Sequence, residues 1–257
     1  MCVPWRWKKE ASNRARREIE EAARQEQLRA NLLRSISHDL RTPLTSISGN
    51  ALILTEKNPL LTEEKRRELS AAIYEDANWL NHLVENLLSI TRMENGQVNL
   101  RIQPELVQDI FDDVLTYLDY DAARHTIVTN VADDLLMADM DAQLIEQVLV
   151  NLINNAIKYT PEHSRIELFA APEGKFVRIC VTDDGPGIPE ESRDKLFDMF
   201  YTLGKTRSDG RRGLGLGLAL CRSIVAAHGG VIDVQNAAPH GACFRFTLPR
   251  TEVTLYE

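Results

Sequence analysis

The sequence has few cysteines and no long apolar run. Its cysteines, Cys2, Cys180, Cys221 and Cys243, are widely spaced and form no C-x-x-C pair, a pattern that indicates neither a zinc site nor a disulfide scaffold and favours a reducing compartment. No run of about 18 apolar residues is present, so we expect no segment of this chain to span a bilayer, and its start lacks the apolar core of a signal peptide. A broad basic face is also missing, because the net charge is −8 and both signs are mixed, which argues against a nucleic-acid partner.

The residues that are present fit a soluble globular protein of one or two domains. Apolar residues make up 44% of the chain and charged residues 26%, which is enough to build buried cores. Residues 5–9 read WRWKK. Aromatic and basic residues flank the cytoplasmic end of membrane helices, so either the natural protein continues upstream into a membrane or this segment is an ordinary polar start.

Two long helices are predicted in the first part of the chain. Strong helix formers and a long apolar stripe predict one helix over about 12–56, which Asn58-Pro59 ends. Thr62 is the expected N-cap of a second helix, which Asn95-Gly96 stops. The first stripe contains Leu28, Leu32, Ile36, Leu40, Leu44, Ile47, Ala51 and Leu54, and the second contains Leu69, Ile73, Leu80, Val84, Leu87 and Ile90.

These two helices predict an antiparallel hairpin that pairs with a second copy. One hairpin can cover each stripe on one side only, so we expect a homodimer that forms a four-helix bundle. After residues 97–103 the pattern becomes mixed and predicts a second domain, an α/β sandwich with helices on one side of a mixed sheet. Its helices are predicted over 104–124, 140–159 and 216–228, and its strands over 126–131, 165–169, 176–181, 231–234 and 243–248.

The first candidate for chemistry is His38, followed by Asp39 inside the first helix. His38 lies two residues from both Ile36 and Leu40, about 200° around a helix from each, so it should face solvent. A neutral imidazole is a good nucleophile, and Asp39 can accept or orient the ring proton. Pro43 removes a hydrogen bond and loosens the helix just beyond. By itself, an exposed histidine before an aspartate is usually plain surface.

The second candidate is a polar row on the helix predicted over 140–159. Asn151, Asn155 and Lys158 lie together along the flank of its apolar face. Amide oxygens suit Mg²⁺, and a lysine neutralises phosphate oxygens. The alternative for this row alone is a solvated helix face.

Two glycine segments are further candidates. A predicted strand is followed by Asp183-Asp184-Gly185-Pro186-Gly187-Ile188-Pro189, where glycines allow close approach to a flat ring and a carboxylate accepts a bond from an exocyclic amine. An ordinary turn is the alternative. Gly213, Gly215 and Gly217 lead into a helix whose free N–H groups can hold phosphate. The spacing matches neither a P-loop nor a dinucleotide fingerprint.

A further segment lies between these two. Residues 196–201 are mostly apolar and predict an anchor. Residues 202–212 are polar and basic and predict a mobile lid that screens charge and excludes water, with a plain surface loop as the alternative.

In this order the five segments resemble the H, N, G1, F and G2 boxes of sensor histidine kinases of two-component systems, whose ATP-binding domain shares its fold with gyrase-, Hsp90- and MutL-type ATPases. The resemblance runs from about Leu28 to Pro249. The runs at 38–43, 221–230 and 241–249 look most like the cytoplasmic catalytic portion of Kdp-type potassium-responsive sensor kinases. The implied domains are a signalling helix or juxtamembrane segment over 1–27, a dimerisation and histidine phosphotransfer domain over 28–96, a linker over 97–103, a catalytic ATP-binding domain over 104–250 and a tail over 251–257.

The resemblance also implies a role for each matched residue. His38 would be the phospho-acceptor, Asp39 its base, and Thr42 the residue that positions water for dephosphorylation of the partner. Asn155 would hold Mg²⁺, and Asp183 would read adenine. The other pocket residues would be Asn151, Lys158 and Tyr159 around the phosphates and ribose, and Gly185, Gly187, Gly213, Gly215 and Gly217 shaping the pocket.

The expected function is therefore autophosphorylation from Mg-ATP, then transfer to an aspartate of a response-regulator receiver domain, with dephosphorylation of the same partner. The expected location is cytoplasmic, with the full-length protein tethered to the inner face of the cell membrane through segments absent from this chain. Two alternatives stay open: a gyrase- or Hsp90-like ATPase clamp without phosphotransfer, and a dimeric scaffold with a vestigial nucleotide site.

Overall fold

The fold was obtained as a computed structural model, which describes residues 40–55, 61–94, 99–116, 118, 124–203 and 215–251. Contacts divide the chain into two units, Met1–Val84 and Glu85–Glu257. Each unit is described by itself.

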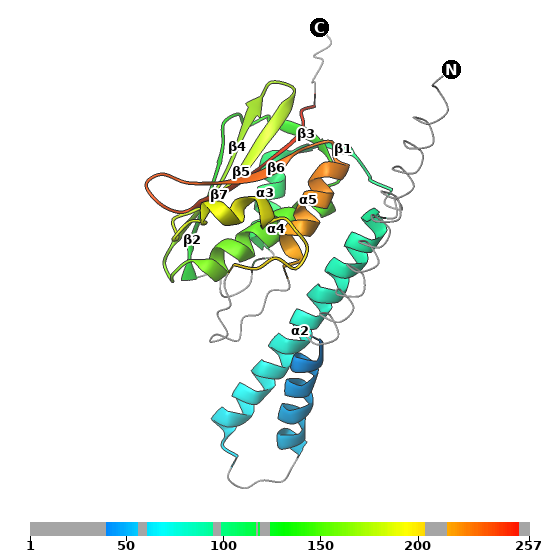
Figure 1. The fold of residues 1–257 in the computed structure, drawn as a ribbon, viewed down its shortest axis with the longest axis vertical. Helices are drawn as coiled ribbons and strands as arrows, with labels where there is room; N and C mark the ends of the chain where they lie inside the picture. The colour runs from blue at the N-terminus through cyan, green and yellow to red at the C-terminus, as the bar shows by residue number, and fades with distance from the viewer. Residues whose placement is uncertain are drawn as a thin grey trace, which may run out of the picture. The chain divides into compact units, whose positions relative to one another are not determined.

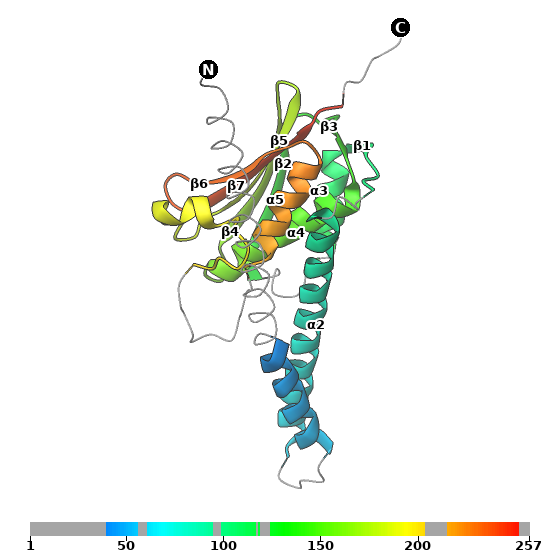
Figure 2. The ribbon, with the colours of Figure 1, turned by 45° about the vertical axis from the view of Figure 1, so that its right-hand side comes forward.

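The described part of the first unit contains a helix over 40–55 and residues 63–84 of α2 (Glu63–Glu94), whose residues 85–94 belong to the second unit. Thr62 is the N-cap of α2, as predicted, because its Oγ1 accepts a hydrogen bond from Lys65 N at 3.2 Å. The helix over 40–55 runs beside the first turns of α2 in both views (Figures 1 and 2). The helices of the described ranges all lack the apolar length needed to cross a bilayer.

The hairpin leaves part of its predicted apolar stripes uncovered within one chain. Pro43 and Leu83 are buried. Leu44 is 51% exposed and Val84 is 48% exposed, although both belong to the predicted stripes. Exposed leucine and valine on the same hairpin are what an unpaired half of a helical bundle presents.

The second unit places three helices against one face of a five-stranded sheet, with a two-stranded sheet beside it (Figures 1 and 2). Its elements in chain order are β1 (Gln103–Leu106), α3 (Val107–Thr116), β2 (Thr126–Val131), β3 (Met137–Met140), α4 (Ala142–Tyr159), β4 (Arg165–Glu173), β5 (Phe176–Asp183), the 3₁₀ helix η2 (Glu190–Lys195), α5 (Gly217–Ala227), β6 (Ile232–Asn236) and β7 (Ala242–Pro249). The large sheet has the order β2-β4-β5-β7-β6. Only β2 and β4 pair in parallel; the other neighbours are antiparallel.

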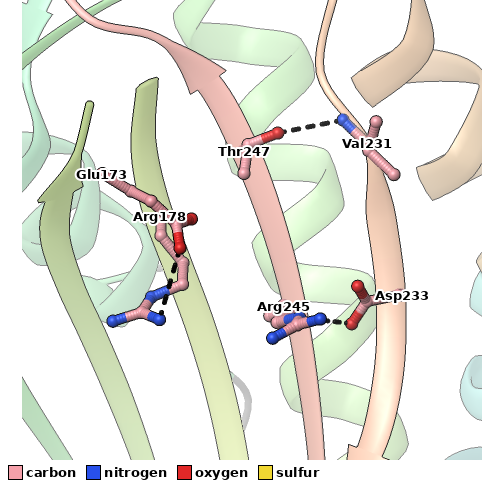
Figure 3. Close-up of polar contacts among 6 residues, drawn as sticks. All are labelled: Glu173, Arg178, Val231, Asp233, Arg245 and Thr247. Carbon is pink, nitrogen blue, oxygen red and sulfur yellow. Dashed lines mark hydrogen bonds and ion pairs between the residues drawn. The ribbon is translucent and has the colours of Figure 1, made fainter. Parts of the chain in front are cut away.

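The core lies between the helices and one face of this sheet because strand residues alternate between the two faces. In β7, Phe244, Phe246 and Leu248 are buried, whereas Arg245 and Thr247 lie on the other face. That outer face carries polar pairs, such as Arg245 with Asp233 at 2.6 Å (Figure 3). The helical side is completed by the apolar face of α4, which consists of Ile145, Val148, Leu149, Leu152, Ile153 and Ala156.

The elements of the α/β sandwich are confirmed with two corrections. The helix predicted over 104–124 is wrong at both ends, because residues 103–106 form β1 and α3 covers only Val107–Thr116. The strand β3 was not predicted at all. Both strands have four residues and pair with each other, Gln103 opposite Met140, so long-range pairing decides their structure rather than a local pattern.

His228 joins the end of α5 to the start of α4. Its ring is 4% exposed, and Nε2 accepts a hydrogen bond from Asp141 N at 3.0 Å. A backbone N–H can only donate, so the ring proton is on Nδ1, which lies 2.8 Å from the carbonyl oxygen of Ile224 and donates to it. Asp141 in turn caps α4, because its Oδ1 accepts from Leu144 N at 3.4 Å. One neutral histidine therefore fixes the two helix ends together.

Replacing His228 by alanine is expected to destabilise the second unit. The N–H of Asp141 would lose its acceptor inside the fold, which costs about 1–3 kcal/mol. For a domain of this size each kcal/mol lowers the melting temperature by about 2–4 °C. Scanning calorimetry should show a fall of about 4–8 °C for His228→Ala, the value for a loss of about 2 kcal/mol, and less than about 2 °C for the control Gln143→Ala, an exposed residue of α4. Equal shifts for the two variants would contradict this role.

Candidate functional site

The polar row predicted on α4 is present. Asn151 and Asn155 are partly exposed on one side of the helix, and the Asn151 amide donates to the carbonyl oxygen of Gln147 at 3.0 Å. At the end of the same side, Lys158 Nζ lies 5.1 Å from the ring centre of Tyr159, which is 50% exposed. The row therefore offers two amide groups, a cation and an aromatic face to a bound molecule.

Asp183 ends β5 and is 8% exposed. Its Oδ1 accepts hydrogen bonds from Gly185 N at 2.9 Å and from Ala242 N at 3.1 Å. Because both bonds end on Oδ1, the other oxygen, Oδ2, is the one left to accept a bond from a bound molecule.

Gly185 connects this carboxylate to the end of α4. A Cβ at Gly185 would lie 2.8 Å from Thr160 Cγ2 and 2.9 Å from Asp183 Oδ1, so no larger residue fits. Thr160 is itself held, since its Oγ1 donates to the carbonyl oxygen of Ala156 at 2.7 Å. The end of the polar row and the segment after β5 are therefore in direct contact.

Three residues that support the segment after β5 were not predicted. The side chain of Asn236, at the end of β6, accepts from Ile188 N at 2.8 Å and donates to Ile188 O at 3.1 Å, as a neighbouring strand would. His240 Nδ1 lies 2.8 Å from the carbonyl oxygen of Asp184. Gly241 packs its Cα against the carbonyl of Asp183. The motif ends at Pro189, whereas these three residues lie about 50 positions later, so local spacing could not find them.

The N-terminus of α5 lies beside the polar row. Leu216 occupies the N-cap position and makes no side-chain cap, so its side chain leaves the first N–H groups of the helix able to bond another acceptor. A Cβ at Gly217 would lie 3.1 Å from Asn151 Oδ1. Gly217 therefore allows α5 to start directly next to α4.

The predicted anchor over 196–201 is buried at its first two residues. Leu196 is 5% exposed and Phe197 6% exposed, and the Phe197 ring meets that of Phe244 edge to face at 6.4 Å. Phe200 N donates to Gly215 O at 3.0 Å, which joins the anchor to the chain just before α5. Most of the predicted lid over 202–212 lies outside the described residues.

The structure brings together most of the predicted site, but not all of it. Asn151, Asn155, Lys158, Tyr159, Asp183, Gly185, Gly187, Gly215 and Gly217 all lie in the second unit. Gly213, His38 and Asp39 lie outside the described residues. Thr42 is in the first unit, where it is exposed on the helix over 40–55.

The chemistry of this cluster suits a nucleotide. A buried carboxylate oxygen can accept from an exocyclic amine, and uncapped N–H groups with a nearby lysine can hold phosphate. Amide oxygens of the Asn151 and Asn155 type are acceptable ligands for Mg²⁺. The residues present therefore fit both a nucleoside triphosphate and its metal ion.

Comparison with known families gives two matches. Residues 28–96 match the His Kinase A (phospho-acceptor) domain. Residues 140–252 match the histidine kinase-, DNA gyrase B- and HSP90-like ATPase family. His38 lies in the first of these ranges, and the cluster around Asp183 lies in the second.

Curated relatives include sensor proteins named KdpD. The chain is 44% identical to that of Clostridium acetobutylicum over 225 residues and 37% identical to that of Escherichia coli over 229 residues. These alignments cover 88% and 89% of the chain, which spans about a quarter of the length of each relative, 25% in both cases.

Solved structures of histidine kinases have the same fold. Acinetobacter baumannii AdeS is 26% identical with a TM-score of 0.65, over 84% of this chain and 98% of that one. ThkA in complex with the response regulator protein TrrA is 25% identical with a TM-score of 0.65, over 98% of this chain and 68% of that one. With a phospho-acceptor region followed by a kinase-type ATPase region, the chain belongs to the histidine kinase family and is similar to the Kdp-type sensor kinases.

Proposed function

We propose that this chain binds Mg-ATP in its second unit, transfers the γ-phosphoryl group to His38, and passes it to an aspartate of a response-regulator receiver domain. The observation that carries the proposal is that the polar side of α4, the start of α5 and the end of β5 lie together. There Asn151 lies beside the uncapped start of α5, and Asp183 keeps Oδ2 for a ligand.

In this proposal each part of the cluster recognises a different part of ATP. Asp183 accepts from the exocyclic amine of adenine, with Gly185 and Gly187 giving the ring close access. The start of α5, with Gly213, Gly215 and Gly217, holds the phosphates through backbone N–H groups. Lys158 neutralises phosphate charge, and Asn151 and Tyr159 line the phosphates and ribose.

Asn155 is proposed to hold Mg²⁺ through its amide oxygen. The ion would supply charge neutralisation at the phosphates. Its ligand lies on α4 four residues after Asn151, on the same side of the helix.

His38 is proposed as the nucleophile because its neutral ring can attack phosphorus directly. A nitrogen–phosphorus bond forms, the bond from phosphorus to the bridging oxygen of ADP breaks, and Asp39 orients or accepts the ring proton. Catalysis is then largely a matter of bringing the imidazole in line with the phosphoryl group.

The first unit is proposed to form a homodimer and to receive the response regulator. Leu44 and Val84 are about half exposed in one chain, which a second hairpin would cover. Thr42, exposed on the helix over 40–55, is proposed to position water when the partner is dephosphorylated. ThkA, one of the structural neighbours, is solved with a response regulator, which favours this kind of partner. The similarity to Kdp-type kinases favours a potassium-linked signal and a cytoplasmic site tethered to the membrane.

Asp183→Asn is a sharp test of the adenine assignment. The amide oxygen can keep the two bonds from Gly185 N and Ala242 N, while the amide nitrogen would point a donor at the adenine amine. We expect ATP affinity, measured by calorimetry, to fall at least about tenfold, which corresponds to about 1.4 kcal/mol. The exposed neighbour provides the control, and Asp184→Asn should stay within about twofold of the parent. Unchanged ATP affinity in Asp183→Asn would refute the assignment.

His38→Ala tests phosphotransfer separately from ATP binding. With γ-labelled ATP, the parent should incorporate label and His38→Ala should incorporate none, because the attacking nitrogen is missing. Both should be stabilised to the same extent by Mg-ATP in a thermal melt. A second histidine of the helical unit, replaced in His82→Ala, is the control and should still be labelled. Labelling of His38→Ala at the parent's level would favour an ATPase clamp or another acceptor.

A further inference from the structure

Two cysteines lie on the outer face of the sheet, away from the helices. Cys180 is on β5 and Cys243 is on β7, which pair in an antiparallel manner. The register places Cys180 opposite Arg245 and Cys243 opposite Thr182. The thiols are therefore diagonal neighbours on the same face of adjacent strands.

Their surroundings are polar and contain an ion pair. Arg245 stands opposite Cys180 and is held by Asp233, with 2.6 Å between Nε and Oδ1 (Figure 3). Cys180 is 9% exposed, covered by its neighbours, whereas Cys243 is partly open to solvent. Cys243 is therefore the more accessible of the two cysteines.

The pKa values of the two thiols are shifted in opposite directions. Hydrogen bonding from Cys180 lowers the pKa of Cys243 to about 6, with further help from Thr182 and Arg245 against the effects of burial and of Asp233. The pKa of Cys180 is raised, first by the same bond and then by burial. Cys243 is therefore the thiol of the pair that ionises more readily, and the thiolate is the form that acts as a nucleophile.

We propose that Cys180 and Cys243 form a modification site at which Cys243 exchanges with small disulfides, such as oxidised glutathione, while Cys180 is its hydrogen-bond donor. The thiolate of Cys243 attacks one sulfur of the disulfide, a new sulfur–sulfur bond forms, and the old one breaks. The released thiolate takes a proton from water. Two electrons pass from the protein sulfur to the leaving sulfur, so the small disulfide is the oxidant.

The register of β5 and β7 keeps the two cysteines too far apart to form a disulfide with each other, so exchange stops at the mixed disulfide. Diagonal residues on neighbouring strands have Cα atoms about 7–8 Å apart. A disulfide needs about 4.4–6.8 Å. Attack by Cys180 on the mixed disulfide would require the strands to shift within a five-stranded sheet. The product therefore keeps the small thiol on Cys243, one residue from the Ala242 N–H that holds Asp183.

The test is the pH dependence of thiol alkylation by iodoacetamide, followed at each cysteine by peptide mass spectrometry in a Cys2→Ala background. The rate at Cys243 should rise with a midpoint near pH 6. Cys180→Ala should move that midpoint toward the ordinary value of about 8.5. Thr182→Val should move it in the same direction by less. Thr247→Val is the matched control on the same face and should leave it unchanged, because Thr247 Oγ1 bonds Val231 N instead.

Cys221 provides the internal reference, because it is 0% exposed and burial raises its pKa to about 12, so it should stay unlabelled in the folded protein. After incubation with oxidised glutathione at pH 7, the main product should carry one glutathione on Cys243. A midpoint near 8.5 in the parent, no effect of Cys180→Ala, or a Cys180–Cys243 disulfide as the main product would each overturn the proposal.

Discussion

The carboxylate of Asp183 lies where three segments of the chain meet, and it is 8% exposed. A charge this deeply placed is tolerated only when it is well bonded. Its Oδ1 takes one N–H from the turn after β5 and one from the first residue of β7, so the same oxygen sets the path of both. These two hydrogen bonds hold the turn in place, because breaking them would leave a buried carboxylate oxygen unpaired. Since both end on Oδ1, Oδ2 can accept a bond from a ligand.

The second constraint is the position of α5, which touches α4 near both of its ends. At its start, Gly217 allows the backbone to approach Asn151, and at its end His228 receives the N–H of Asp141. The helix has 11 residues and is therefore about 16 Å long. A helix fixed at both ends presents its free N–H groups in a constant direction, which is what a phosphate site requires.

The sequence predicted the parts of this protein that rest on local pattern. The apolar face of α4, the alternation in β7 and the Thr62 cap follow from periods and caps that a few neighbouring residues define. The pairing of β1 with β3 could not be read in this way, because each strand is too short to show a period and is stabilised by the other.

The candidate site likewise contains residues that local motifs predict and residues that only long-range strand pairing brings in. Asp183 and the polar row on α4 stand in compact motifs, whereas Asn236 and His240 act on the turn after β5 from a segment about 50 residues later in the chain. Only the folded register of β6 and β7 brings them there. The two thiols are a similar case, since Cys180 and Cys243 are far apart in sequence and become neighbours only through the pairing of β5 with β7.

Successive side chains of a strand point to opposite faces of the sheet, so the ends of β5 and β7 carry different chemistry on the helical face and on the outer face. Asp183 and Ala242 point to the helical side, while their neighbours Thr182 and Cys243 point outward and stand opposite each other. A group added to Cys243 would act on the same strand whose Ala242 N–H holds the carboxylate. The outer thiol and the residue whose N–H holds Asp183 are therefore adjacent on β7 and lie on opposite faces of the sheet.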